Sequence, residues 1–230
     1  MGLFITFEGP EGSGKTTQMR LLADWLQAQG RDVLTTREPG GTPIGDAIRG
    51  LLLDPVNADM SPPAEILLFS AARAQHVAQV IEPQLVRCGT LLCDRFADST
   101  LAYQGYGRGL DLERLRMITA FATGGLTPDL TFCLDLSVVE GLRRKRSDGP
   151  AEWNRMEREV LEFHERVRQG YLALARDDPQ RWVVLDASQP VVEIQAQIRA
   201  HVAARMPRNV LARGEKGDCD EAHPGRREQR

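Results

Sequence analysis

Residues 8–17, EGPEGSGKTT, decide the fold of this 230-residue chain. Three glycines fall within residues 9–14, a lysine and two threonines follow, and the apolar run LFITF (3–7) comes directly before them. Residues 9–16 match the pattern G-x-x-x-x-G-K-[ST], in which a glycine-rich turn joins a strand to a helix. Glycine permits positive φ and a close approach of the backbone, and N–H groups at a helix N-terminus bind phosphate. The stretch therefore predicts a loop that binds a nucleoside polyphosphate; a glycine-rich surface turn is the alternative.

The residues of this loop have expected roles. Lys15 is expected to reach the β- and γ-phosphates, and the hydroxyl of Thr16 is expected to ligate Mg²⁺. The predicted nucleotide-binding set is Gly9, Pro10, Glu11, Gly12, Ser13, Gly14, Lys15, Thr16 and Thr17. A bound triphosphate is compatible with a small-molecule kinase, a GTPase-type switch, or an ATPase motor or assembly factor. The sequence lacks the N-K-x-D motif expected of a guanine-specific switch, and a motor would normally need a longer chain for partner domains. A phosphate acceptor site is therefore expected elsewhere in the chain.

Short apolar runs alternate with longer helical patterns along the chain. The runs are continuously apolar, which is typical of strands covered on both faces of a parallel sheet. Strands are expected at 3–7, 33–36, 90–94, 130–135 and 182–186, and helices at 15–29, 43–53, 64–87, 111–123, 137–146, 152–177 and 190–204. The alternation predicts an α/β fold: a five-stranded parallel sheet with helices on both faces. A single domain is expected over residues 1–206, and the polar, aperiodic residues 207–230 are expected to form a disordered tail.

The composition argues against several other function classes. The net charge of −3 is unlike that of nucleic-acid binders, which are usually basic, so no nucleic-acid partner is expected. No apolar run approaches the roughly 18 residues that span a bilayer, and Glu8 interrupts the short N-terminal run, so neither a membrane span nor a signal peptide is expected. Cys93 and Cys133 lie in apolar runs and no C-x-x-C pair occurs. This pattern favours buried, reduced thiols and a cytoplasmic location.

Three further motifs carry chemistry, two of them directly after predicted strands, where an open parallel sheet binds its ligands. Asp94 and Arg95 close one strand. The acid would hold a water of the Mg²⁺ shell, and the guanidinium would clamp a phosphate, although an isolated Asp-Arg pair is more typical of a surface ion pair. REPGG (37–41) leaves another strand. Phe69 and Arg73 stand four residues apart on one helix face, so that one would stack on a base and the other bond its carbonyl oxygens; a core phenylalanine beside a surface arginine is the alternative.

Taken together, these motifs form a specific set. EGPEGSGKTT, TREPGG (36–41), LLFSAAR (67–73), DRFADSTLAYQGYGRG (94–109) and TPDLTFCLD (127–135) occur in an order and spacing that resemble the bacterial thymidylate kinases. The resemblance runs from Ile5 to about His201. It implies a P-loop nucleoside monophosphate kinase fold, transfer of the γ-phosphate of MgATP to dTMP to give dTDP for dTTP synthesis and DNA replication, and a homodimer. A kinase acting on UMP or CMP, or a nucleotide-binding switch without a small-molecule acceptor, are the rival hypotheses.

The resemblance also implies an acceptor site. Its expected residues are Glu11, Glu38, Pro39, Arg49, Phe69, Arg73, Arg95, Ser99, Thr100, Tyr103 and Gln104, and its metal-side residues are Thr16 and Asp94. By the same resemblance, Phe69 would stack on thymine and Arg73 would bond its O4. Arg95 would hold the dTMP phosphate, Tyr103 would crowd the 2′ position of the sugar, and Glu11 would contact the 3′-hydroxyl. One position departs from the family pattern, because Phe96 stands where tyrosine or histidine is usual.

Catalysis is expected to rest on positioning and charge neutralisation. The acceptor phosphate has a second pKa of about 6 and is already deprotonated at pH 7, so no general base is required and guanidinium groups, Lys15 and Mg²⁺ suit the task. Arginines cluster in LRRKRSDGPAEWNRME, within an expected lid at about 143–156. The loop carries Gly12 where some family members have arginine, so the sequence resembles the type that supplies the arginine from the lid. The candidates are Arg146 and Arg155, with Arg155 preferred for its N-R-M-E context; a solvated basic helix end is the alternative.

Overall fold

The computed structural model describes residues 2–147 and 154–206. The predicted tail and the middle of the predicted lid lie outside these residues. Within them, five parallel strands form one sheet in the order β2-β3-β1-β4-β5, which confirms the α/β prediction. The strands are β1 (Leu3–Glu8), β2 (Val33–Arg37), β3 (Thr90–Asp94), β4 (Leu130–Asp135) and β5 (Trp182–Asp186).

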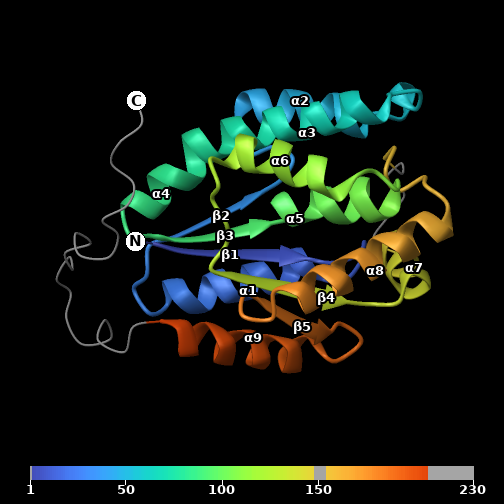
Figure 1. Cartoon of the computed structure of the whole chain (residues 1–230). Coiled ribbons are helices and arrows are strands. Elements are labelled where there is room, and N and C mark those ends of the chain that lie inside the picture. Colours follow the sequence, from blue (N-terminus) through green and yellow to red (C-terminus); the bar gives the residue numbers. More distant parts are fainter. Residues whose placement is uncertain (1, 148–153, 207–230) are drawn as a thin grey trace.

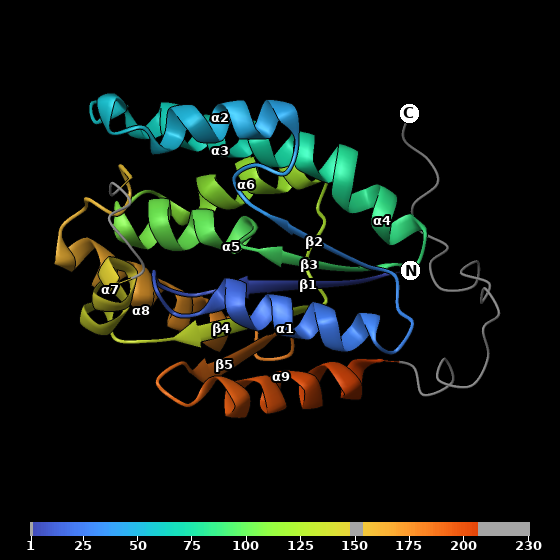
Figure 2. The same ribbon diagram turned by 180° about the vertical axis from the view of Figure 1, so that it is seen from behind.

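Helices cover both faces of the sheet, as Figures 1 and 2 show from opposite sides. On one face, α1 (Lys15–Gln27) and α9 (Val191–Arg205) pack against side chains of β1, β4 and β5. On the other face, α8 (Leu161–Asp177) and the π-helical segment η3 (Leu101–Gly107) form a second apolar cluster. Because alternate strand residues point to opposite faces and each face is buried, the strand sequences are apolar throughout.

The remaining helices lie on the η3 side of the sheet, except α7, which lies at the carboxyl end of the sheet against the phosphate loop (Figure 1). They are α2 (Pro43–Leu53), the 3₁₀ turn η1 (Pro55–Asn57), α3 (Pro62–His76), the π-helical segment η2 (Val77–Ile81), α4 (Glu82–Val86), α5 (Ala97–Thr100), α6 (Leu112–Thr123) and α7 (Val138–Ser147). In Figure 1, α2 lies outside α3, farther from the sheet. None of the described helices is both long and apolar enough to cross a bilayer.

The helices differ from the sequence prediction in three places. The helix expected at 64–87 contains the π-helical segment η2 between α3 and α4. The helical residues 97–107 were not predicted at all. The helix expected at 152–177 begins only at Leu161, because residues 154–159 form turns fixed by contacts to distant elements. Such long-range contacts override local helical pattern, and they matter for the lid.

The sheet order places the functional loops together. β1 lies between β3 and β4, and the connections that leave the carboxyl ends of β1 and β3 lead to helices on opposite faces of the sheet, α1 and η3. Open α/β sheets bind their ligands where neighbouring connections diverge in this way. In Figure 1 the arrowheads of the strands point to this end, and α7 and the start of α8 lie beside it.

Candidate active site

A cavity of about 1470 Å³ opens at the carboxyl ends of the strands. It is lined by the phosphate loop from Glu11 to Thr17, by the ends of β2 and β3, and by residues of α3, η3 and α7. All eleven residues expected at the acceptor site line it, and so do Thr16 and Asp94. These residues are Glu11, Glu38, Pro39, Arg49, Phe69, Arg73, Arg95, Ser99, Thr100, Tyr103 and Gln104. The cavity thus joins segments that are distant in the sequence, with lining residues from Glu11 to Ile194.

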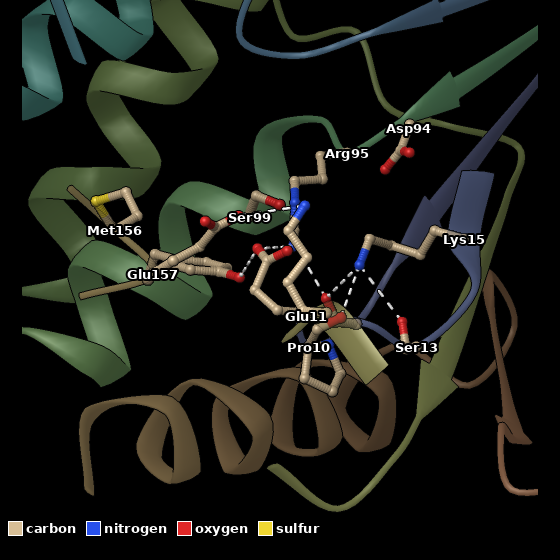
Figure 3. A network of polar contacts seen from close by, with 12 residues as sticks. Pro10, Glu11, Ser13, Lys15, Asp94, Arg95, Ser99, Met156 and Glu157 are labelled. Carbon is tan, nitrogen blue, oxygen red and sulfur yellow. Dashed lines mark hydrogen bonds and ion pairs between the residues drawn. The ribbon is translucent and has the colours of Figure 1, made fainter. Parts of the chain in front are cut away.

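The phosphate loop has the backbone that its glycines predict. Gly9, Gly12 and Gly14 all have positive φ, of 130°, 68° and 90°, a region that other residues rarely adopt. The ammonium group of Lys15 donates to the carbonyl oxygens of Gly9 at 3.1 Å and Pro10 at 2.7 Å (Figure 3). Burial, with the nearby Arg95 charge, lowers the pKa of Lys15 to about 8. A polyphosphate bound in the loop would place further negative charge beside this buried cation and favour its charged form.

Gly12 is packed directly against α7. A β-carbon at this position would collide with the carbonyl oxygen of Gly141, and one at Gly141 would collide with the carbonyl oxygen of Glu11. The two glycines therefore let α7 lie against the phosphate loop. A side chain as large as arginine does not fit at position 12 with α7 in this place.

Arg95 adopts a strained backbone at the end of β3. Its φ is 69°, a left-handed conformation that costs energy in a non-glycine residue and is found mostly at functional sites. Its guanidinium donates to Glu11 Oε1 at 2.7 Å and to the hydroxyl of Tyr171 at 2.8 Å. Burial alone would raise the pKa of Glu11, but the charges of Arg95 and Lys15 outweigh it and lower that pKa to about 2. Figure 3 shows Lys15, Glu11 and Arg95 converging above the loop.

Two predicted metal-side residues meet at the start of α1. The hydroxyl of Thr16 donates to Asp94 Oδ2 at 2.6 Å. Thr16 lies in the first turn of α1, beside the phosphate loop, and Asp94 is the last residue of β3. The sheet order therefore brings together two residues that are 78 positions apart in the sequence. Hydroxyl and carboxylate oxygens beside a phosphate loop are the ligands and water acceptors that Mg²⁺ prefers.

The predicted base site lies on α3. Phe69 is half-buried and faces the cavity rather than the core. Arg73 is 2% exposed; it donates through Nε to Glu38 Oε2 at 2.8 Å and through Nη1 to Thr100 Oγ1 at 3.0 Å. The interpretation of Arg73 as a surface residue is therefore wrong: the guanidinium is buried and held by an acid.

The two residues expected near the sugar, Tyr103 and Glu11, lie next to each other. The hydroxyl of Tyr103 donates to Glu11 Oε1 at 3.1 Å, and the Arg95 guanidinium lies 5.0 Å from the Tyr103 ring centroid. Arg49 reaches the same cavity from α2 and donates to the carbonyl oxygen of Pro39 at 2.9 Å.

Glu8 and Tyr171 do not line the cavity but contact the site residues Ser99 and Arg95, and the sequence did not predict them. Glu8 accepts from the Ser99 hydroxyl at 2.6 Å and from the Tyr171 hydroxyl at 2.9 Å, and Tyr171 in turn contacts Arg95. Burial, reinforced by the Asp98 charge, raises the pKa of Glu8 to about 7. Tyr171 lies on α8, and no local pattern in the sequence links it to Arg95.

The structure places neither of the two arginines expected in the lid, Arg146 and Arg155, in the lining of the cavity. Arg155 is buried: it donates through Nε to the carbonyl oxygen of Leu52 at 2.9 Å and forms an ion pair with Glu65. Glu65 also holds Arg108, at 2.7 Å from its Nε. Neither Arg155 nor Arg146 lines the cavity; the basic residues of α7 that do are Arg143, Arg144 and Lys145. Residues 148–153, between the two arginines, lie outside the described part of the chain.

Phe96 has an apolar role that suits its departure from the family pattern. Its ring is fully buried and packs edge-on against Phe4, with ring centroids 5.0 Å apart. Its backbone N–H, rather than a side-chain group, makes the polar contact, to Glu8 Oε1 at 2.8 Å.

Comparison with known proteins agrees with this geometry. The family model described as thymidylate kinase matches residues 7–198. A thymidylate kinase of Roseiflexus sp. (strain RS-1) is 57% identical over 212 residues, covering 88% of this chain and 94% of the relative. One of Deinococcus radiodurans is 55% identical over 204 residues, covering 89% of this chain and 98% of the relative. The crystal structure of thymidylate kinase from Ehrlichia chaffeensis superposes with a TM-score of 0.70 at 33% identity, covering 87% of this chain and 98% of that chain. The chain therefore belongs to the thymidylate kinase family and phosphorylates dTMP to dTDP with ATP as the donor.

Proposed function

We propose that the transfer is direct, from ATP in the phosphate loop to dTMP held between α3 and η3, with Lys15 and Arg95 on the reacting phosphates. The observation that carries this proposal is the single cavity that all predicted acceptor residues share with the loop. Arg95 Nη2 lies 2.7 Å from Glu11 in the loop, so a phosphate bound by Arg95 would lie close to one bound by Lys15. Catalysis is then positioning and charge neutralisation, since a phosphate monoester needs no general base at pH 7.

We further propose Mg²⁺ at Thr16 and Asp94. Their oxygens are 2.6 Å apart at the mouth of the loop, which fits a small oxygen-preferring cation that keeps several waters. One hydroxyl and one carboxylate beside the phosphates of a bound nucleotide are ligands that this ion takes in kinase and ATPase sites. Mg²⁺ would neutralise charge on the phosphates.

The lid-arginine type is also a proposal. Its support is Gly12, where α7 leaves no room for a side chain. Arg146 is exposed near the end of α7, and Arg155 could contact the transferred phosphate only after leaving the carboxylate of Glu65. Breaking a buried ion pair costs about 3–5 kcal/mol.

A homodimer and a cytoplasmic location complete the proposal. Large apolar side chains are exposed on neighbouring helices α2, α3 and α6: Ile44, Leu51, Leu67, Met117 and Phe121. Exposed large apolar side chains on adjacent helices are typical of a subunit interface. Cys93 and Cys133 are buried free thiols, as in proteins of reducing compartments.

One assay tests the acceptor and the competing classes together. ADP release coupled to a reporter would be measured with dTMP, UMP, CMP and no acceptor. We expect release to require dTMP and Mg²⁺. Equal release without any acceptor would indicate a nucleotide hydrolase and contradict the proposal, and preference for UMP or CMP would contradict the base site.

A further inference from the structure

His76 is a buried histidine that touches the base site from behind. It lies on the last turn of α3, is fully buried, and is not among the residues that line the cavity. Its Nδ1 lies 3.0 Å from Glu38 Oε1, and its Nε2 lies 2.7 Å from Thr36 Oγ1. Thr36 is on β2 and Glu38 directly follows it, so the imidazole ties α3 to the end of an edge strand.

Glu38 divides its two oxygens between His76 and Arg73. Oε1 contacts the imidazole, and Oε2 accepts from Arg73 Nε at 2.8 Å. A carboxylate only accepts hydrogen bonds, so Nδ1 of His76 is the donor. With one oxygen fixed by the imidazole, the carboxylate cannot rotate freely, and its second oxygen has one position to offer Arg73.

Arg73 presents the rest of its guanidinium to the cavity. Besides Nε, it donates through Nη1 to Thr100 Oγ1 at 3.0 Å and through Nη2 to the carbonyl oxygen of Phe96 at 3.2 Å. These contacts use three of the five N–H groups of arginine. One N–H on each terminal nitrogen remains for a ligand, and its direction depends on the plane in which Glu38 holds the guanidinium.

The backbone encloses the imidazole ring. A β-carbon at Gly41 would lie 2.8 Å from both Cδ2 and Nε2 of His76, so the glycine of the REPGG segment makes room for this ring. The ring therefore has little freedom to turn, and it can transmit the position of β2 to Glu38.

We propose that His76 is a positioning residue for base recognition: the chain Thr36–His76–Glu38–Arg73 fixes the guanidinium plane so that its N–H groups meet a carbonyl oxygen at position 4 of the base. This inference rests on the proposed role of Arg73. A carbonyl at that position accepts from Arg73, whereas the amino group of cytosine is a donor and leaves both partners unsatisfied. His76 thus contributes to selectivity for dTMP over dCMP without touching either nucleotide.

Two substitutions separate the two ring nitrogens. His76→Asn keeps a nitrogen near the position of Nδ1 and loses the contact to Thr36, whereas His76→Gln keeps one near Nε2 and loses the contact to Glu38. Each variant loses one hydrogen bond of the ring, so a merely structural role predicts similar melting temperatures and similar kinetics for both.

We expect a difference in the ratio of kcat/KM for dTMP to kcat/KM for dCMP. His76→Gln should lower this ratio by about tenfold, through a higher KM for dTMP. The charged hydrogen bond from Arg73 to the carbonyl oxygen of the base would no longer be aligned, and its loss accounts for a change of about this size. His76→Asn should retain most of the ratio, and the KM for ATP should change in neither variant. His76→Phe, which keeps a ring against Gly41 but no nitrogen, should match His76→Gln and serves as the second variant if the glutamine protein does not fold.

Arg73→Lys distinguishes failure of this inference from failure of the base site. If Arg73→Lys leaves the ratio unchanged, the proposed role of Arg73 is wrong. If Arg73→Lys lowers the ratio but the asparagine, glutamine and phenylalanine variants of His76 keep it or lower it equally, Arg73 reads the base and the positioning role of His76 is overturned.

Discussion

The phosphate loop and the segment 154–159 each carry a basic residue that the sequence assigns to the transferred phosphate, yet they are held in opposite ways. Lys15 contacts carbonyl oxygens only five and six residues away. Arg155 contacts the carbonyl oxygen of Leu52 and the carboxylate of Glu65, which are 103 and 90 residues away. The loop makes its site from its own backbone, whereas the segment is positioned by α2, α3 and Arg108.

This difference decides what each residue is free to do. Lys15 lines the cavity, and we expect it to exchange the carbonyl oxygens of the loop for phosphate oxygens when a nucleotide binds. Arg155 is committed to a buried carboxylate, which lies on the same face of α3 as Phe69, one turn away. We therefore expect substitutions in the loop to act on catalysis, and substitutions in the segment to act on stability and on the acceptor site.

The largest expected effect is that of Arg155→Ala on stability. Removing one partner of a buried ion pair costs about 3–5 kcal/mol, so the free energy of unfolding in denaturant titrations should drop by that order, with a higher KM for dTMP. Arg176→Ala, at an exposed position on α8, is the control and should leave stability nearly unchanged. Unchanged stability together with a kcat lowered about 10²-fold would instead make Arg155 the catalytic lid arginine. It would contradict the expected difference between the phosphate loop and the segment 154–159.

Lys15→Ala should lower kcat by roughly 10²-fold or more, because its charge follows the phosphoryl group during transfer. Stability should change by less than about 1 kcal/mol, since burial already disfavours the charged form, as the lowered pKa shows. Steady-state kinetics and thermal melts on the same preparation check both. An active Lys15→Ala enzyme would remove Lys15 from the reaction.

Phe69→Ala should weaken dTMP binding by about 1–3 kcal/mol for a lost stacking partner, with little change for ATP. Direct binding titrations of each nucleotide measure this. Equal weakening of dTMP and ATP binding would mean that Phe69 supports the fold of α3 and does not stack on the base. The position of Glu65 one turn from Phe69 would then give no reason to expect an effect of Arg155 on the acceptor site.

The smallest expected effect is at the sugar. Tyr103→Ala should narrow the preference for dTMP over its ribonucleotide by about tenfold at most, the order expected for a steric contact of this size. Tyr103→Phe keeps the ring and loses only the hydrogen bond to Glu11, so it should retain the preference. An unchanged ratio in the alanine variant would exclude Tyr103 from the sugar site.

Much of the site could be predicted because its residues stand in recognisable local patterns. The loop, the REPGG segment and the Phe69–Arg73 pair each have the pattern of ligand contacts, and residues of each line the cavity. Glu65 and His76 could have been suspected, since they lie four residues before Phe69 and three after Arg73 on the same helix face. Tyr171 could not, because its contact to Arg95 depends on how α8 crosses the sheet.

The sequence by itself determined the phosphate loop, the parallel sheet and the family, since glycine backbone freedom, continuous apolar strands and motif spacing are local properties of the chain. Only the tertiary structure decided which arginines are buried and which carboxylate each of them contacts. Arg73 and Arg155 look alike in sequence, but one is held by Glu38 at the edge of the cavity and the other by Glu65 away from it. The reason is physical: a buried guanidinium requires a carboxylate partner, and which carboxylate is near depends on the packing of helices that are distant in sequence.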